Sequence, residues 1–167
     1  MSIKARLTAK EVYFLAKCMG AKYLDYYYFA AMSDIEKRYT LHEQQALESL
    51  EEKEIIEEDF SGNIEIPDEV IRLFEPVFFG KKESMLNNGE IHRIHILGSR
   101  LTISSPDQGE FLFFEASDED LEKLLKGTVQ IECSDIDSGV SRKVFSGEQL
   151  MQEKYRKEAI RLCRGGV

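Results

Sequence analysis

Apolar residues recur at helical spacing near the start of the chain. The spacing predicts a first helix from Ala9 to Met19. Thr8 and Glu11 have the spacing of a capping box, in which each side chain satisfies a backbone N–H at the start of the helix. Gly20 is suited to end the helix. Residues 1–7 are expected to be a short lead-in.

The next segment is rich in aromatic residues and predicts a second helix, which begins at Tyr23 or Asp25 and ends at Lys37. Successive side chains on a helix lie about 100° apart, so the three tyrosines of Tyr26 to Tyr28 cannot all point inward. Exposed tyrosines would form a contact surface. Alternatively, they belong to a core whose hydroxyls reach its edge, which is the interpretation that we favour.

Residues 40–79 combine helical and alternating patterns. The predicted elements are a helix from Thr40 to Lys53, opened by a capping box of Thr40 and Glu43, strands at Ile55–Ile56 and Ile64–Ile66 around the turn Asp59–Asn63, and a helix opened by Pro67. Pro76 is expected to end or bend this helix near Phe74. The whole stretch therefore predicts a helix, an acidic hairpin and a second helix.

Strand patterns dominate after Ser84. They predict an antiparallel meander of Ile91–Leu97, Leu101–Ser104 and Glu110–Glu115, with joints at Gly98–Ser99 and Ser105–Gly109, then a helix from Ser117 to Gly127, strands at Thr128–Cys133 and Val144–Phe145, and a last helix from Ser146 to Arg164. The sequence predicts a single α+β domain over 1–167. It has a helical half (1–83) with a winged-helix-like hairpin, and a half (84–167) with an antiparallel sheet flanked by helices.

Charge narrows the set of partners. The 167 residues carry a net charge of −9, which disfavours nucleic-acid phosphates and anionic membranes. The acidity would suit a basic partner, although solubility alone is the commoner reason for it. The three cysteines are widely spaced and are expected to be reduced thiols. No apolar run reaches the ~18 residues of a membrane span, so we expect a soluble, cytoplasmic protein without membrane insertion.

Candidate chemical groups do not combine into a catalytic motif. His92 and His95 are three residues apart on a predicted strand, so they point to opposite faces and cannot hold one metal ion. The acidic run from Glu48 to Asp59 is interpreted as a solvated face, with docking of a basic partner as the alternative. No nucleophile or phosphate-binding motif is present. We therefore expect no enzyme activity, no cofactor and no metal.

The order of helices and hairpin also suggests a winged-helix transcription regulator. A winged helix that binds DNA needs Lys and Arg on its recognition helix and wing. Here the corresponding segments read LHEQQALESLEEKE and IIEEDFSGNIEI, which would repel phosphate. The shape is therefore predicted without nucleic-acid binding.

Several segments together resemble a known family. LTAKEVYFLAKCMG, ALESLEEKEIIEEDFSGNIEIPDEVIRLFEPVF, IHRIHILGSRLTISS and EFLFFEASDEDLEKLLKG are similar to segments of the EspG-like chaperones of type VII (ESX/Ess) secretion, and closest to the short EsaE-like proteins of Gram-positive bacteria. The resemblance covers about residues 7–127. In the stretch from Leu50 to Ile56, Glu54 stands where glycine is common in the family, a departure that bears on the local turn rather than the fold.

The resemblance implies a cytosolic chaperone that binds a specific secreted protein, keeps it soluble and delivers it to the secretion ATPase. The client would be a basic toxin or a WXG100- or LXG-type protein. Candidate contact residues are on the tyrosine segment, the second joint of the meander and the last helix: Tyr26, Tyr27, Pro106, Asp107, Gln108 and Tyr155. The alternatives are the winged-helix regulator, another protein-interaction module, or a small hydrolase using Glu, Asp or Cys.

Overall fold

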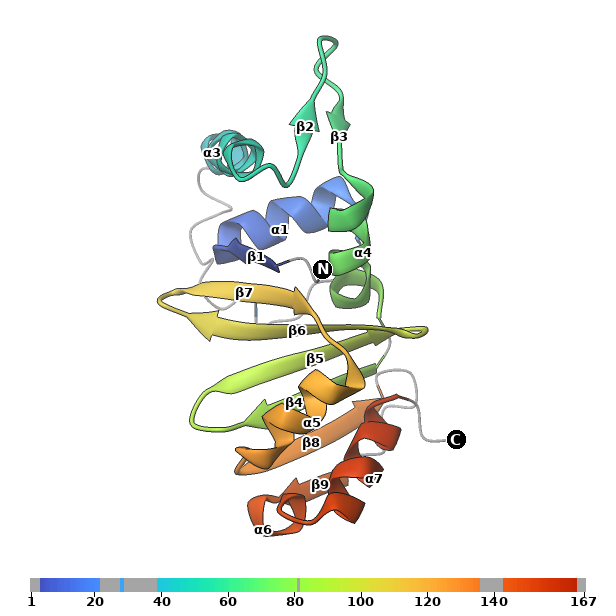
Figure 1. Cartoon of the computed structure of the whole chain (residues 1–167). Helices are drawn as coiled ribbons and strands as arrows, with labels where there is room; N and C mark the ends of the chain where they lie inside the picture. The colour runs from blue at the N-terminus through green and yellow to red at the C-terminus, as the bar shows by residue number, and fades with distance from the viewer. Residues whose placement is uncertain (1–3, 22–27, 29–38, 81, 136–142, 165–167) are drawn as a thin grey trace.

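A seven-stranded antiparallel sheet forms the centre of the molecule (Figure 1). The computed structural model describes residues 4–21, 28, 39–80, 82–135 and 143–164. Within these residues the strand order is β1-β7-β6-β5-β4-β8-β9. The strands are β1 (Lys4–Leu7), β4 (Lys82–Asn87), β5 (Ile91–Leu97), β6 (Arg100–Asp107), β7 (Glu110–Glu115), β8 (Gln130–Asp135) and β9 (Lys143–Ser146). Helices flank the sheet, which confirms the predicted α+β class.

The predicted meander is confirmed as β5, β6 and β7. Its first turn is Gly98–Ser99, but its second is shorter than predicted, because β6 continues to Asp107 and pairs there with Glu110. The lead-in expected at residues 1–7 is wrong for its described part. Lys4–Leu7 is an edge strand that pairs with β7, and it alternates exposed and buried residues. β4 was not predicted, although it lies between β5 and β8.

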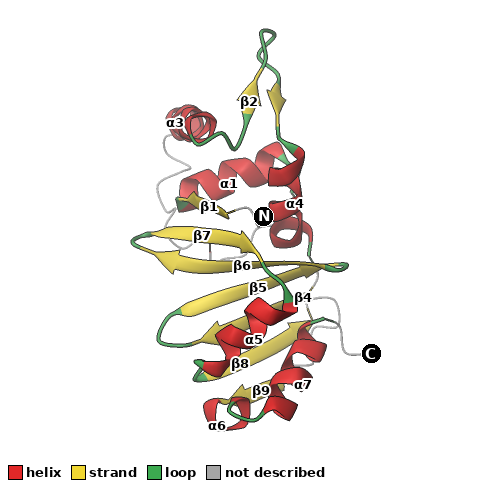
Figure 2. Cartoon of the chain, viewed as in Figure 1, coloured by secondary structure: helices red, strands yellow, loops and turns green. Residues whose placement is uncertain are grey.

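The helices divide between the two ends of the sheet (Figure 2). They are α1 (Ala9–Cys18), α3 (Tyr39–Glu52), α4 (Asp68–Phe79), α5 (Asp118–Lys126), α6 (Gly147–Leu150) and α7 (Glu153–Cys163). The capping box predicted for α1 is present. Helix α5 also begins with a capping box, formed by Ser117 and Asp120, which was not predicted. The box predicted at Thr40 is wrong, because α3 begins at Tyr39 and Thr40 lies inside its first turn. Apart from Tyr28, the helix predicted for residues 23–37 lies outside the described residues.

Helix α3 ends in a Schellman motif. The Glu54 N–H bonds to the Glu51 carbonyl and the Ile55 N–H to the Leu50 carbonyl, both at 2.9 Å. Leu50 and Ile55 are both buried, which supplies the apolar contact of the motif. The residue that turns the chain is Glu54, with a φ of 61°, in the left-handed region that favours glycine. This is the position at which glycine is common in the family that the sequence resembles.

The hairpin and α4 differ from the prediction at two points. Ile55–Ile56, predicted as a strand, is instead buried in the core, and the hairpin strands are β2 (Glu57–Glu58) and β3 (Ile64–Glu65). Pro76 does not end α4 near Phe74. The helix continues because Pro76 is buried and Phe78 stacks on Phe74 at a centroid distance of 5.6 Å. This packing offsets the one hydrogen bond that the proline removes.

The last predicted helix is divided in two. α6 ends at Leu150 and α7 begins at Glu153. Leu150 is buried whereas Met151 is 77% exposed. The break between the two helices therefore follows directly after the buried Leu150.

Two cores lie on opposite faces of the sheet. Register places Phe113 and its neighbour Phe114 on alternate faces of β7. Phe113 packs with α1 and α4 in the first core, and Phe114 packs against the second core, which α5 and α7 cover. Tyr28 is fully buried in the first core. Its hydroxyl shares a hydrogen bond of 2.5 Å with His95 Nε2, which favours the core interpretation for this tyrosine.

Candidate functional site

An open apolar groove lies at the end of the molecule formed by α1, the hairpin and α4. It has a volume of about 540 Å³. A smaller hollow of about 200 Å³ adjoins it between α1 and α3, and the two share Cys18 and Ile64. The residues that line the larger hollow, called here the apolar groove, are Cys18, Met19, Ile64, Ile66, Ile71, Glu75 and Phe79.

Local structure explains why these residues meet. Ile71, Glu75 and Phe79 stand at four-residue intervals on α4 and therefore form one stripe along it. The buried residues of α4, such as Val70 and Phe74, occupy the neighbouring stripe against the sheet. Helix α4 is thus apolar over a wider arc than its core contact requires. The second stripe forms one wall of the groove.

The groove and the hairpin leave large apolar side chains in contact with solvent. Phe79 is 40% exposed and Ile64 is 38% exposed. Phe60, in the turn of the hairpin, has no burial at all. A single exposed apolar residue needs no explanation, whereas several close together are a candidate interaction surface. The hairpin projects from the body of the protein, so its tip is accessible (Figure 1).

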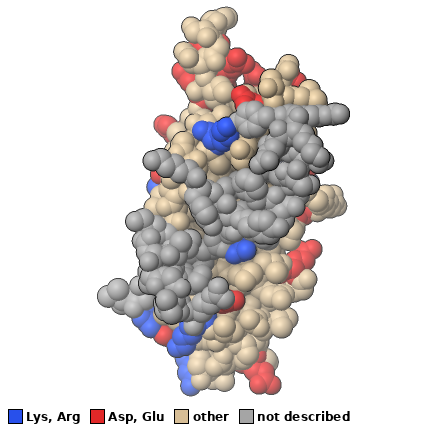
Figure 3. All heavy atoms as spheres, turned by 180° about the vertical axis from the view of Figure 1, so that it is seen from behind, with Lys and Arg blue, Asp and Glu red and all other residues tan. Residues whose placement is uncertain are grey.

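Negative charge is concentrated at the same end. Residues 39–79 hold twelve acidic and two basic residues, a net charge of −10, whereas the rest of the chain has nineteen acidic and twenty basic residues. The whole negative charge of the protein is therefore carried by α3, the hairpin and α4. Figure 3 shows carboxylate side chains gathered around the hairpin end.

A buried carboxylate connects the start of α1 to the end of α3. Glu11 is 2% exposed, and its carboxylate accepts hydrogen bonds from Lys53 Nζ at 2.8 Å and Ser49 Oγ at 2.7 Å. Burial acts to raise the pKa of Glu11, but the hydrogen bonds from Lys53, the Thr8 N–H and Ser49 outweigh it and lower that pKa. The carboxylate is therefore ionised, and it links the start of α1 to α3.

Cys18 and Glu75 are the titratable residues that line the groove. Burial, with the nearby charge of Glu43, raises the pKa of the Cys18 thiol, so Cys18 is a poor nucleophile. The carboxylate of Glu75 is paired with Arg100 at 2.9 Å. No group of three or more metal-ligating side chains occurs among the residues that the structure describes.

Of the six contact residues predicted from the sequence, the four that the structure describes do not line the groove. Tyr26 and Tyr27 lie outside the described residues. Pro106 and Asp107 belong to β6, and Gln108 is in the following turn. Tyr155 is on α7, half-buried against the second core, at the opposite end of the molecule from the hairpin. The structure thus keeps Asp107 and Tyr155 on separate elements and does not bring them together.

The turn with Gln108 is ordered by its own contacts. Gln108 and Gly109 have φ values of 51° and 83°, which are typical of a two-residue type I′ turn. Asp107 forms an ion pair with Arg6 of β1. These contacts give Asp107 and Gln108 a structural role that is sufficient to explain them.

The two histidines lie on opposite faces of β5, as predicted. His92 Nδ1 is 2.6 Å from Ser105 Oγ and its Nε2 is 2.8 Å from Asn88 Oδ1. His95 instead contacts Tyr28 in the first core. Burial lowers the pKa of His92, so its ring is neutral near pH 7.

Sequence reasoning missed the groove because its residues come from three distant segments. The one signal available was the second apolar stripe of α4, Ile71 and Phe79.

Among the described residues, no helix is both long enough and apolar enough to span a bilayer. Comparison of the chain with models of known protein families and with curated proteins finds no match.

Proposed function

We propose that this protein is a cytosolic substrate-binding adaptor, a chaperone that holds a secreted protein soluble and delivers it to a type VII secretion ATPase. The observation that carries the proposal is that the apolar groove and the entire net negative charge lie on one end of the molecule. Apolar contact supplies affinity, and charge supplies partner choice and a fast encounter. The resemblance in residues 7–127 supplies the class of partner.

The same features make the alternatives less suitable. A winged-helix regulator would have to present α3 and the hairpin to DNA. These elements include Glu57 and Glu58, which are exposed and acidic, so phosphate would be repelled. A hydrolase that used the groove would need an activated nucleophile there, but the cysteine that lines it, Cys18, has a raised pKa.

Co-expression tests the proposal. The chain is expressed with candidate clients of the WXG100 or LXG type, and the tagged chain is purified at low and high salt. We expect one client to co-purify in a defined ratio and to precipitate when it is expressed alone. Failure to retain any of these proteins, together with solubility of each on its own, contradicts the proposal. Retention of DNA at low salt would instead support the regulator.

Groove variants locate the contact. Phe79→Ser and Ile64→Ser remove exposed apolar side chains, and we expect each to weaken client binding about tenfold, the effect of ~1.4 kcal/mol. Val144→Ser is the matched control, because Val144 is 50% exposed on β9, far from the groove. Equal loss of binding in all three variants would show that the groove is not the contact surface.

A further inference from the structure

Two buried cysteines from distant parts of the chain meet under the last helix. Cys133 of β8 and Cys163 at the end of α7 have sulfur atoms 3.7 Å apart. Both side chains are almost fully buried. Ser84 of β4 pairs with Cys133 across the sheet, and its Oγ lies 3.2 Å from Cys163 Sγ. The two thiols therefore form a defined pair.

We propose that Cys133 and Cys163 are an oxidisable dithiol that a peroxide converts to a disulfide. The sulfur atoms are already in contact, and a bond requires them to approach to about 2.05 Å. Cys133 lies in strand β8, whereas Cys163 is the last residue of helix α7. A small movement of this helix end would bring the two sulfur atoms to bonding distance. This modification is independent of the client-binding function proposed above.

The chemistry proceeds in two balanced steps. The thiolate of Cys133 attacks one oxygen of the peroxide, which breaks the O–O bond, forms a sulfenic acid on Cys133 and, for hydrogen peroxide, releases hydroxide. The sulfur of Cys163 then attacks the Cys133 sulfur, forms the S–S bond and expels the sulfenic oxygen, which leaves as water with the Cys163 proton. The peroxide is reduced, and the two thiols are oxidised by two electrons in total.

The surroundings assign these roles to the two sulfurs. The hydrogen bond from the Cys163 thiol lowers the pKa of Cys133. The same hydrogen bond, together with burial, raises the pKa of Cys163. The thiolate is the form that reacts with peroxide. Cys133 is thus the attacking thiol and Cys163 the resolving one.

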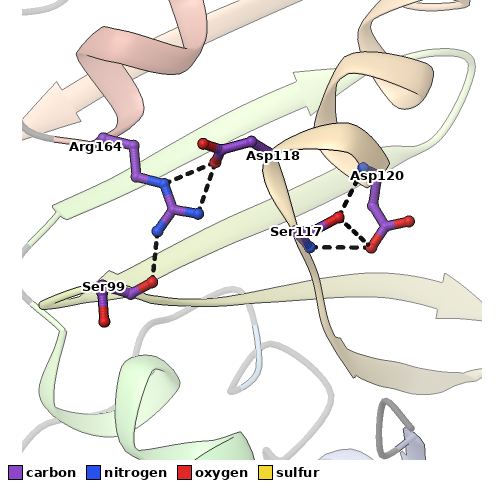
Figure 4. Close-up of polar contacts among 5 residues, drawn as sticks. All are labelled: Ser99, Ser117, Asp118, Asp120 and Arg164. Carbon is purple, nitrogen blue, oxygen red and sulfur yellow. Dashed lines mark hydrogen bonds and ion pairs between the residues drawn. The ribbon is translucent and has the colours of Figure 1, made fainter.

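An ion pair next to Cys163 controls the access of peroxide to the two cysteines. Arg164, the next residue, donates from Nε and Nη2 to Asp118 Oδ1 at 2.9 and 2.6 Å, and from Nη1 to the Ser99 carbonyl at 2.7 Å (Figure 4). These bonds fasten the last turn of α7 to α5 and to the turn between β5 and β6. Peroxide reaches the buried sulfurs when this turn opens, because helix ends open locally at low cost.

The experiment uses the folded full-length chain with Cys18→Ala, which removes the third thiol. After hydrogen peroxide treatment without denaturant, we expect an intact mass lower by about 2 Da, restored by dithiothreitol. The disulfide closes a loop between residues 30 apart and is expected to raise Tm by roughly 5–10 °C. The proposal is overturned if peroxide only raises the mass by adding oxygen atoms. It is also overturned if the mass still falls by about 2 Da in Cys133→Ala or Cys163→Ala.

A matched pair of variants tests the access route. Arg164→Ala is expected to accelerate disulfide formation roughly tenfold, because it removes the charged bonds that hold the last turn closed. Arg161→Ala is the control, since Arg161 pairs with Glu158 on the exposed side of the same helix and is expected to leave the rate unchanged. Equal rates in both variants would refute Arg164 as the gate.

Discussion

Replacing Glu54 by glycine should stabilise the protein. Glu54 has a φ of 61° at the end of α3 and is exposed. A left-handed conformation costs a residue with a β-carbon about 1–2 kcal/mol. Glycine avoids this cost, but it adds about 0.4–1 kcal/mol of backbone entropy to the unfolded chain. The difference predicts a net gain of about 0.5–1 kcal/mol for Glu54→Gly.

Thermal and urea unfolding measure this gain. For a domain of this size, it corresponds to a rise in Tm of about 1–4 °C, and to a urea midpoint higher by roughly 0.3–0.5 M. The slope of the urea transition should not change, because the unfolded surface is the same. Binding of a client at the groove should also be retained, since the motif keeps its two hydrogen bonds.

Charge must be separated from backbone strain in this experiment. Glu54 follows Glu51 and Glu52, so removing its carboxylate also relieves repulsion. Glu54→Gln removes the charge but keeps the strained conformation. Glu54→Ala also removes the charge and keeps the strain, and it has no long side chain. If either variant is as stable as Glu54→Gly, the strain argument is wrong.

Three further variants test the core and its polar contacts. Phe113→Ala should cost about 3–5 kcal/mol, measured by urea unfolding, because this fully buried ring packs against three other aromatic rings. Gly80→Ala should cost more than about 2 kcal/mol, because a β-carbon would lie 2.2 Å from the Pro76 carbonyl oxygen and 2.7 Å from that of Ile96; stability equal to wild type would refute this close approach. Glu11 has a lowered pKa, so its contribution is complete above the ordinary carboxyl pKa and is lost as pH falls through the folded value. Glu11→Gln should therefore be less stable at pH 7 and lose less stability than wild type on acidification from about pH 4.5; parallel pH curves would contradict this role.

Elements with strong local signals were predictable from the sequence. Helix α5 has its cap, apolar stripe and terminal glycine within a dozen residues, and the meander turns at Gly98. β1 and β4 lacked such signals. β1 has only four residues, and β4 reads KESMLN without clear alternation. Both are strands because of their partners, which no local pattern specifies.

Long-range packing also decided the remaining differences. The burial of Phe78 carried α4 past Pro76, and the burial of Leu150 divided the last helix. The site depended on the same kind of information. Cys18, Ile64 and Phe79 are ordinary apolar residues in the sequence, and only their meeting at one end of the molecule defines the groove.

The pairing of β1 with β7 has a consequence for synthesis on the ribosome. Ala5 pairs with Phe113, so its partner is made more than a hundred residues later. Until then, the apolar residues of β1 and α1 have no sheet to cover, and their pairing is a non-local and therefore slow step. The nascent chain thus exposes these apolar residues while the segment between β1 and β7 is made, and closure of this edge of the sheet is timed by the arrival of β7.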